Sequence, residues 1–343
     1  MASEGKQGTA TYDAAPNIAL IKYWGMRDPS LGLPTNSSLS VTLDRLRSRT
    51  TVRFDPALSE DEFTLNGIRP SGGPLDAVVR FLDRVRSLAG FSTRAEVTSS
   101  NNFQTASGLA SSASGFAALA GAASHAAGLA LPPRKLSQLA RFGSGSASRS
   151  VFGGFVEWEA GNRPDGEDCY ARPLYDSDHW PTLVDVVALV AGAPEKSVRS
   201  AEAMQASVGT SPGYAARQAA LPARLRAVRE AIRRRDGPRL FELIMEECDD
   251  FRRVCETTQP ALDYLTPVSR QILATVHDLN HAEGRNLAGY THDAGAHVHI
   301  FTLADDASLL RRRLADIEGI SRVLTLHPGP GGHLVQGPSP RRR

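Results

Sequence analysis

The feature that most constrains this chain is the stretch NNFQTASGLASSASGFAA, residues 101–118, in which small hydroxyl-bearing residues lead directly into an apolar helix. The first N–H groups of a helix have no partner within it, and the aligned peptide dipoles make that end partly positive. Gly108 allows the chain to bend closely around a ligand, and the hydroxyls of Ser111, Ser112 and Ser114 add donors. The stretch therefore predicts a phosphate cradle. A serine-rich start of a core helix over 115–127 would give the same pattern.

Length and composition limit the class of protein. The 343 residues, 41% hydrophobic and 22% charged, predict a globular protein with two domains, or one two-lobed domain with a cleft. The net charge of +2, with acidic residues interspersed among the arginines, argues against a nucleic-acid partner. No apolar run resembles a signal peptide or a membrane span, so we expect neither. The spacing of Cys169, Cys248 and Cys255 predicts free thiols in a reducing cytoplasm.

Short strand-like runs alternate with helical periodicity, which predicts an α+β fold. In the first half we expect helices over 74–88, 115–127 and 134–141 and strands over 18–23, 38–43, 50–54, 62–65, 94–98 and 155–159. In the second half we expect helices over 222–234, 237–254, 267–282 and 307–317 and strands over 185–190, 288–291, 297–303 and 322–326. We expect two lobes, residues 1–186 and 187–343, with a ligand cleft between them.

Lys22 stands inside the apolar segment PNIALIKYWG, where a solvated charge has no obvious place. A buried ammonium is costly unless it is paired, so the segment predicts an adjacent carboxylate or a bound phosphate. The alternative is a lysine at a strand end whose ammonium reaches water along its own stem.

Arg149 follows a glycine–serine loop, RFGSGSASRSVFGGF, which contains Ser144 and Ser146. A guanidinium can bind two oxygens at once, and small neighbours allow a ligand to approach the backbone, so this loop predicts a carboxylate or phosphate site. Pairing of Arg149 with a surface acid is the alternative.

Asp293 lies in the segment THDAGAHVHIF, in a turn that precedes a strand. A carboxylate there is well placed to act as a base or to orient a hydroxyl. His297 and His299 share one face of the strand, so a metal site with Asp293 is an alternative, although a half-buried strand gives the same alternation. The scattered histidines give no basis for a Ser–His–Asp set, and the sequence lacks GxxxxGK[ST] and GxGxxG motifs, which disfavours the P-loop and dinucleotide-binding classes.

Taken together, these segments resemble the mevalonate diphosphate decarboxylase family of the GHMP kinase superfamily. The resemblance rests, in order, on PNIALIKYWGMRD, LPTNSSLSVTLD, NNFQTASGLASSASGFAAL, FGSGSASRSVFGGFVEW, KSVRSAEAM, HDAGAHVHI and HPGPGGH. It implies a GHMP kinase fold, with a ribosomal-S5-like N-terminal lobe, a ferredoxin-like and helical C-terminal lobe, and a cleft between them. It also implies ATP and Mg²⁺ as cofactors, a 5-phosphorylated mevalonate as substrate, and a homodimer.

The resemblance further implies roles for individual residues in an ATP-dependent decarboxylation, in which the 3-hydroxyl is phosphorylated and phosphate and CO₂ then leave. Asp293 would act as the base for the 3-hydroxyl or orient it, and Lys22 would keep the carboxylate of Asp293 ionised. Arg149 would hold the substrate carboxylate. The implied substrate contacts are Asn17, Tyr23, Ser144, Ser146 and Ser200. The implied contacts of the ATP phosphates are Gly108, Ala110, Ser111, Ser112 and Ser114, with Ser112 also indirectly at Mg²⁺.

Several positions depart from the family pattern, among them Gln104 and Ala296–His297, and two further positions bear on the substrate. Met26 stands where members acting on the diphosphate generally have a lysine, and Ala201 where some carry an arginine. The loss of these cations weakens the case for a second phosphate, although Arg199 or Arg27 could compensate, and related decarboxylases that accept the 5-monophosphate also have Met at this place. The resemblance therefore leaves 5-diphosphomevalonate and 5-phosphomevalonate nearly equal as predicted substrates, with a slight preference for the diphosphate because it is the more frequent substrate in the family. A mevalonate 3-kinase that stops after phosphorylation and a non-catalytic nucleotide-binding protein are further alternatives. The retained set of lysine, arginine and aspartate favours complete decarboxylation.

Overall fold

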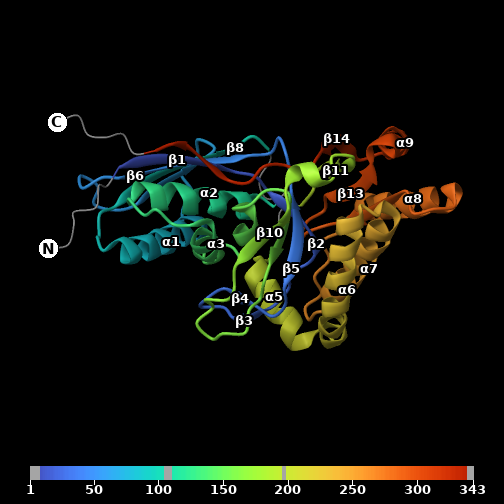
Figure 1. The fold of residues 1–343 in the computed structure, drawn as a ribbon, viewed down its shortest axis with the longest axis horizontal. Helices are drawn as coiled ribbons and strands as arrows, with labels where there is room; N and C mark the ends of the chain where they lie inside the picture. Colours follow the sequence, from blue (N-terminus) through green and yellow to red (C-terminus); the bar gives the residue numbers. More distant parts are fainter. Residues whose placement is uncertain (1–7, 104–109, 195–197, 338–343) are drawn as a thin grey trace.

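The computed structural model of the chain describes residues 8–103, 110–194 and 198–337. Helices and strands form two lobes that lie side by side (Figure 1), so the predicted α+β class is confirmed. Within the described ranges, no helix has the length and apolar character needed to cross a bilayer. Cys169, Cys248 and Cys255 are free thiols, as predicted, and all three are buried.

The first sheet of the N-terminal lobe has the strand order β15-β1-β6-β8-β7. Its strands are β1 (Thr9–Ala14), β6 (Ser48–Phe54), β7 (Glu62–Leu65), β8 (Ala95–Asn101) and β15 (His333–Gln336). All neighbours are antiparallel except β7 and β8. Helices α1 (Gly73–Ala89), α2 (Ser111–Ala126) and α3 (Pro133–Arg141) belong to the same lobe.

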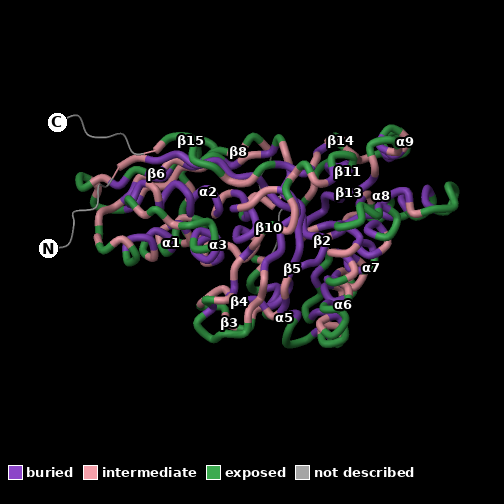
Figure 2. Tube along the Cα trace, in the orientation of Figure 1, coloured by how far each residue is buried: buried purple, intermediate pink, exposed green. Residues whose placement is uncertain are grey.

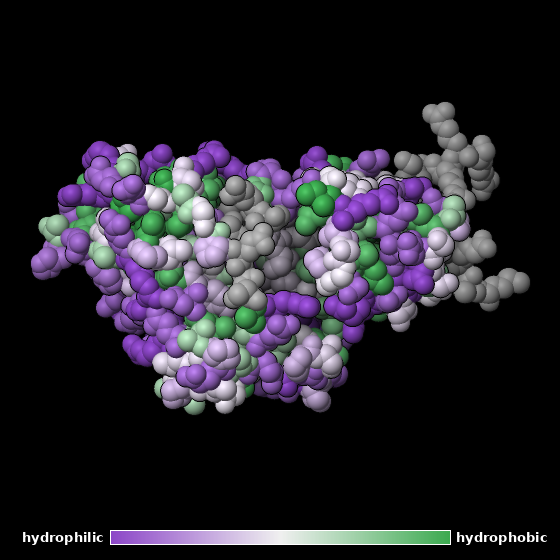
Figure 3. All heavy atoms as spheres, turned by 180° about the vertical axis from the view of Figure 1, so that it is seen from behind, coloured by the Kyte–Doolittle hydropathy of each residue, from purple (hydrophilic) through white to green (hydrophobic). Residues whose placement is uncertain are grey.

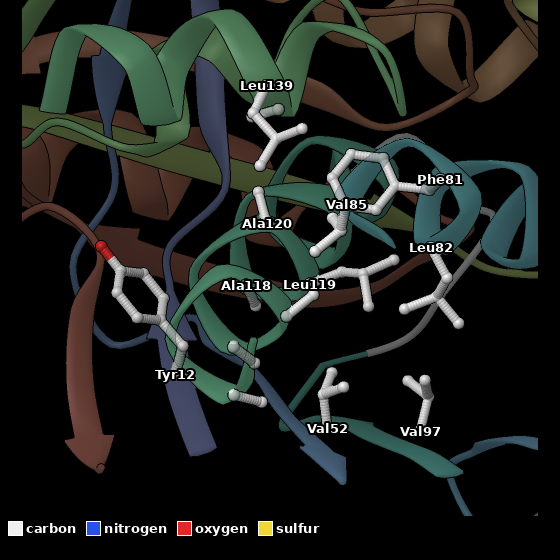
Figure 4. Packing of buried hydrophobic residues seen from close by; sticks show 14 of the residues in the cluster. Tyr12, Val52, Phe81, Leu82, Val85, Val97, Ala118, Leu119, Ala120 and Leu139 are labelled. Carbon is white, nitrogen blue, oxygen red and sulfur yellow. The ribbon is translucent and has the colours of Figure 1, made fainter. Parts of the chain in front are cut away.

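Helix α2 packs closely against this sheet because its buried face is built from alanine and glycine. Figure 4 shows α2 between the sheet residues Tyr12, Val52 and Val97 and the side chains of α1. At Gly121 a Cβ atom would lie 2.3 Å from the ring of Tyr12, so only glycine fits at this crossing. The tight packing fixes the N-terminus of α2, where the phosphate cradle is predicted.

A second sheet, β10-β9-β5-β2, occupies the centre of the molecule. It consists of β2 (Asn17–Ile21), β5 (Ser38–Thr42), β9 (Phe155–Trp158) and β10 (Ala171–Tyr175). Strands β2, β5 and β9 are buried along their whole length, and Figure 2 shows β2 and β5 in the middle of the molecule. The hairpin strands β3 (Met26–Asp28) and β4 (Leu33–Pro34) and the short helix α4 (Ala147–Ser150) lie in the connections.

The C-terminal lobe has one antiparallel sheet, β12-β13-β11-β14, with helices around it. Its strands are β11 (Leu183–Val190), β12 (Ala288–Thr291), β13 (Val298–Leu303) and β14 (Ile320–Leu326). Its helices are α5 (Ser200–Thr210), α6 (Tyr214–Arg234), α7 (Gly237–Glu256), α8 (Pro267–Glu283) and α9 (Ala304–Ala315). The two lobes share a hydrophobic cluster in which Ile18 and Leu20 of β2 meet Val187 of β11 and residues of α6 and α7.

The predicted division into residues 1–186 and 187–343 differs from the arrangement of two segments in the structure. A boundary at 186/187 lies inside β11, which is one continuous strand. The segment after β14 leaves the C-terminal lobe, because Gly329 bonds to the backbones of Thr42 and Gly154 and β15 pairs with β1. Residues beyond 326 therefore add a strand to the first sheet.

The surface is mostly polar. On the face shown in Figure 3, hydrophilic residues predominate and hydrophobic residues occur in small separate groups. The exposed large hydrophobic side chains among the described residues, such as Ile68 and Leu88, are few compared with the core. Such isolated apolar residues are normal for a protein surface.

Candidate active site

A cavity of about 490 Å³ lies where the two lobes meet the start of α2. Its walls contain three residues predicted to be catalytic, Lys22, Arg149 and Asp293, which come from the end of β2, from α4 and from the β12–β13 turn. The other lining residues are Ala19, Tyr23, Trp24, Met26, Ala110, Ser111, Ser112, Gly143, Ser144, Gly145, Ser146, Arg199, Ser200, Ala201, Met204, Phe251 and Ala294. The structure therefore brings segments that are more than 100 residues apart in the chain to one site.

Lys22 and Asp293 form an ion pair in this cavity. The ammonium Nζ lies 2.8 Å from Asp293 Oδ1 and donates a second hydrogen bond of 2.9 Å to the carbonyl oxygen of Ala19. The lysine side chain is 4% exposed, whereas that of Asp293 is 26% exposed, so the carboxylate reaches the cavity while the ammonium stands behind it. The anionic partner predicted for Lys22 is thus a carboxylate, and the strand-end alternative is wrong.

Arg149 is buried and is held by neutral oxygens. Its Nε atom donates to Asn17 Oδ1 at 3.1 Å and to Ser40 Oγ at 2.9 Å, and Nη1 donates to Ser38 Oγ at 2.5 Å. Burial lowers the pKa of Arg149 to about 10, while the charge of Asp293 acts in the opposite direction, so the guanidinium remains protonated near neutral pH. Within the described ranges no carboxylate forms an ion pair with Arg149, which contradicts the surface-acid alternative. The charge is therefore available to an anionic ligand.

The serine loop borders the cavity, but Asn17 lies beneath it. Ser144 and Ser146 line the cavity with their hydroxyl oxygens 3.1 Å apart. Asn17 is 1% exposed, and its amide nitrogen donates to Ser146 O and to Ser150 Oγ. Asn17, predicted as a substrate contact, thus holds Arg149 and the serine loop in place and is absent from the cavity wall described here.

The ring of Tyr23 closes the adjacent wall. It packs edge-on against Trp158, with ring centroids 4.9 Å apart, and burial raises the pKa of its phenol. At Gly145 a Cβ atom would lie 2.8 Å from both rings, so the glycine of the loop allows Tyr23 to approach. Tyr23 therefore offers a neutral hydroxyl to the cavity.

Helix α2 presents its first turn to the same cavity. Ala110, the residue before the helix, has a left-handed backbone (φ 50°), and among the described residues no side chain caps the helix. Ala110, Ser111 and Ser112 line the cavity. Ser114 does not: it is fully buried, with Oγ 2.7 Å from Ser48 Oγ, so its hydroxyl supports the helix from below. Gly108 lies outside the described residues.

One part of the cavity wall is largely apolar. Trp24, Phe251 and Met204 form it, and Trp24 packs edge-on against Phe251 at 4.9 Å between ring centroids. Met26 and Ala201 also line the cavity. This wall thus contributes no charge at the two positions where the family pattern carries cations.

Ser200 and the two arginines considered as compensating cations differ in whether they line the cavity. Ser200 and Arg199 line the cavity at the start of α5, and the Arg199 side chain is 72% exposed, 3.5 Å from Glu202. Arg27 donates instead to the carbonyl oxygens of Ala160 and Arg163, outside this cavity. Of the two compensating cations considered from the sequence, only Arg199 borders the site.

The histidines of the aspartate segment have structural roles. His297 Nδ1 accepts from the backbone N–H of Val190 at 3.1 Å, and His299 Nδ1 lies 2.7 Å from Asp185 Oδ2. Burial lowers the pKa of His297 to about 4. No group of three His, Cys, Asp or Glu side chains in the described part of the chain is arranged to hold a metal ion, so the geometry does not support the alternative metal site of Asp293 with these histidines.

Sequence reasoning missed several residues that build the site. Ser38 and Ser40 lie on one face of β5, and the alternation SLSVT in a buried strand is a signal that could have identified them. Phe251 of α7 and Met204 of α5 are apolar helix residues, and their sequence pattern does not distinguish a cavity wall from a core contact.

Models of two protein families match the chain. Residues 14–171 match the diphosphomevalonate decarboxylase-like N-terminal domain, and residues 186–323 match the mevalonate 5-diphosphate decarboxylase C-terminal domain. The diphosphomevalonate decarboxylase of Homo sapiens is 42% identical over 324 residues, which cover 89% of this chain and 79% of the human protein. That of Aspergillus fumigatus is 40% identical, over 90% of this chain and 80% of the fungal protein.

Solved structures agree. The mevalonate diphosphate decarboxylase of Enterococcus faecalis superposes with a TM-score of 0.88 at 37% identity, covering 96% of this chain and 99% of the other. The Staphylococcus aureus enzyme gives 0.89 at 34% identity, covering 96% and 98%. A further structure, described as MDDEF in complex with MVAPP, AMPPCP and magnesium, gives 0.89 at 38% identity, covering 96% and 99%. The resemblance noted in the sequence is confirmed: the chain belongs to the diphosphomevalonate decarboxylase family.

Proposed function

We propose that the protein catalyses the ATP-dependent decarboxylation of 5-diphosphomevalonate to isopentenyl diphosphate, the reaction that its family membership supports. The observation that carries the proposal is the convergence of Lys22, Arg149 and Asp293 on one cavity beside the N-terminus of α2. These are the charges that the reaction requires: a carboxylate for the tertiary alcohol, a cation for the carboxylate, and N–H groups for phosphates.

Asp293 receives the proton of the substrate's 3-hydroxyl as this oxygen attacks the terminal phosphorus of ATP, and the bond from that phosphorus to the bridging oxygen breaks so that ADP leaves. The neighbouring ammonium of Lys22, 2.8 Å away, favours the ionised carboxylate that can accept this proton. In the second step the C3–O bond breaks and its electron pair leaves with phosphate. Asp293, which is 26% exposed, passes its proton to water before this step, and its restored carboxylate stabilises the positive charge that develops at C3.

Arg149 holds the substrate carboxylate until CO₂ departs, when the electron pair of the broken C–C bond forms the new double bond. Its partners Asn17, Ser38 and Ser40 are neutral, so the guanidinium retains a full charge for this anion. The planar fork also fixes the orientation of the carboxylate relative to C3.

The start of α2 fits the phosphates of ATP. Ala110, Ser111 and Ser112 line the cavity at its first turn, where N–H groups have no partner within the helix, and the helix lacks a side-chain cap in the described structure. Ser112 is the residue we assign indirectly to Mg²⁺, which neutralises phosphate charge when it is bound.

Ser144, Ser146, Tyr23 and Ser200 line the cavity and are proposed contacts of the substrate's phosphate end or carboxylate. The same wall supports a second candidate substrate, 5-phosphomevalonate, because Met26 and Ala201 provide no cation for a second phosphate. Arg199 at the cavity border is the cation through which the diphosphate remains our first choice. We further propose a homodimer in the cytoplasm, as the sequence resemblance and the three free cysteines suggest.

The decisive assay offers the purified protein, with ATP and Mg²⁺, mevalonate, 5-phosphomevalonate and 5-diphosphomevalonate in parallel. Release of both ADP and CO₂ with the diphosphate is the expected result. Accumulation of a stable 3-phosphate without CO₂ would identify a kinase instead. Absence of ADP release with all three substrates would favour the non-catalytic nucleotide-binding alternative.

A further inference from the structure

The backbone of Lys22 is held by side chains rather than by a neighbouring strand. Strand β2 ends at Ile21, so the polar groups of Lys22 lie just beyond the sheet ladder. Its N–H donates to Glu247 Oε1 at 3.0 Å, and its carbonyl oxygen accepts from Arg217 Nη2 at 3.0 Å and from Asn36 Nδ2 at 2.9 Å. Both polar groups of this residue's backbone are therefore satisfied by distant parts of the chain.

Glu247 and Arg217 form one buried unit. Glu247 of α7 is 0% exposed and Arg217 of α6 is 2% exposed. Arg217 Nη2 donates to Glu247 Oε1 at 2.5 Å, and Arg224 Nη1 donates to Glu247 Oε2 at 2.7 Å. Burying such charges costs so much desolvation that apolar residues would often be as stable, so stability alone is a weak reason for their presence.

We infer that Glu247 and Arg217 are positioning residues that fix Lys22 relative to Asp293. Lys22 belongs to the N-terminal lobe, whereas Asp293 and the two positioning residues belong to the C-terminal lobe. The backbone contacts thus align the catalytic ammonium of one lobe with the catalytic carboxylate of the other. This inference rests on the proposed function.

The consequence for catalysis follows from the side-chain geometry. The ammonium must reach Ala19 O at 2.9 Å and Asp293 Oδ1 at 2.8 Å at the same time, so a shift of the Lys22 backbone breaks at least one of these contacts. A displacement of about 1 Å at a catalytic group can cost about a hundredfold in rate.

The test compares two isosteric substitutions. Glu247→Gln keeps an oxygen for the Lys22 N–H but removes the charge that holds Arg217 and Arg224. Glu157→Gln is the matched control: Glu157 is 1% exposed and is bound by Arg229 of the same helix α6, but it contacts neither Lys22 nor the cavity. Each variant removes one buried carboxylate charge that is bound by an arginine of α6.

We expect Glu247→Gln to lower kcat by about tenfold to a hundredfold and to change KM much less, because the step that loses alignment follows binding. Glu157→Gln should leave kcat within about threefold of the unsubstituted protein, whatever its effect on the unfolding temperature. Equal losses of kcat in the two variants would overturn the inference, since a general structural role predicts that result.

A double-mutant cycle with Lys22→Met, measured in single turnovers, sharpens the test. In the Lys22→Met background Glu247→Gln should have almost no further effect on kcat, because there is no ammonium left to position. Effects that multiply would overturn the inference. If Glu247→Gln does not fold, Arg217→Gln serves in the same cycle with the same two outcomes.

The failure of this inference differs from the failure of the proposed function. An unsubstituted protein that releases no CO₂ refutes the function. An active protein whose Glu247→Gln variant is equally active refutes only the positioning role.

Discussion

Replacing Asp293 with asparagine tests the site most directly, because it removes a charge and a base while keeping the shape of the side chain. Loss of a positioned general base costs about a hundredfold to ten thousandfold in rate, so we expect kcat to fall within that range. The substitution leaves Ser111 and Ser112, the proposed nucleotide contacts, unchanged, and ATP affinity should be largely kept.

The same substitution has a predictable effect on stability. Asparagine leaves the ammonium of Lys22, 4% exposed, with neutral partners only, and it also removes the charge that stabilises the guanidinium of Arg149. Breaking a fully buried pair costs about 3–5 kcal/mol, but Asp293 is 26% exposed and the amide oxygen still accepts, so we expect about 1–2 kcal/mol. The opposite change, Lys22→Met, leaves a carboxylate that water can reach and should cost less than about 1 kcal/mol.

Three measurements check this reasoning. ADP and CO₂ release give kcat, calorimetric titration gives the ATP dissociation constant, and urea unfolding gives the free energy of unfolding. The reasoning fails if Asp293→Asn keeps more than about a tenth of kcat. It also fails if Lys22→Met is the more destabilising variant, because the ammonium would then not be the buried member of the pair.

Three further outcomes are expected. Met26→Lys should raise the kcat/KM ratio of diphosphate to monophosphate by about fivefold, the effect of one partly exposed ion pair, and an unchanged ratio would show that this wall does not face the phosphate end. Burial lowers the pKa of His292 to about 4 from its ordinary 6.5, so the unfolded state binds more protons between these values and the free energy of unfolding falls as the pH falls from about 6.5 to about 4. His292→Gln should reduce this loss over the interval by at most about 3 kcal/mol in urea unfolding. An identical pH dependence in the two proteins would contradict the prediction. Gly121→Ala places a methyl group 2.3 Å from the ring of Tyr12 and should destabilise by about 1–3 kcal/mol, whereas Gly115→Ala on the same helix has open space and should be neutral or stabilising; a similar unfolding temperature for both variants would refute this account of α2 packing.

The predicted elements that agree with the structure are those with a strong period. The helical patterns over 237–254 and 267–282 correspond to α7 and α8, whose apolar stripes face the core. By contrast, α6 begins at Tyr214 and not at the predicted Pro222. Proline is common at the first position of a helix, which is why the sequence suggested a start there, but Pro222 lies inside α6. Strand β1 was not predicted because TATYDA alternates weakly: all but its first residue are buried.

The chemistry of the site was predictable where an ionisable residue interrupts an apolar segment. Lys22 is the clearest case, since its burial demands a partner. Asn17 and Ser114 lie in the correct segments, but which way a polar side chain points depends on the packing around it, and both point into the protein. Glu247 was missed although it occupies the apolar stripe of α7 between Ile244 and Phe251, which marks it in the same way as Lys22.

Strand β15 has a consequence for the order in which the chain can acquire its structure during synthesis. Because β15 pairs with β1, and Gly329 bonds to Thr42 and Gly154, the sheet that begins with residue 9 is completed only by residues near 336. A ribosome adds residues vectorially, so the first lobe must wait for nearly the whole polypeptide to emerge before its last strand can dock. The contacts of Gly329 with Thr42 and Gly154 therefore form among the last events of folding.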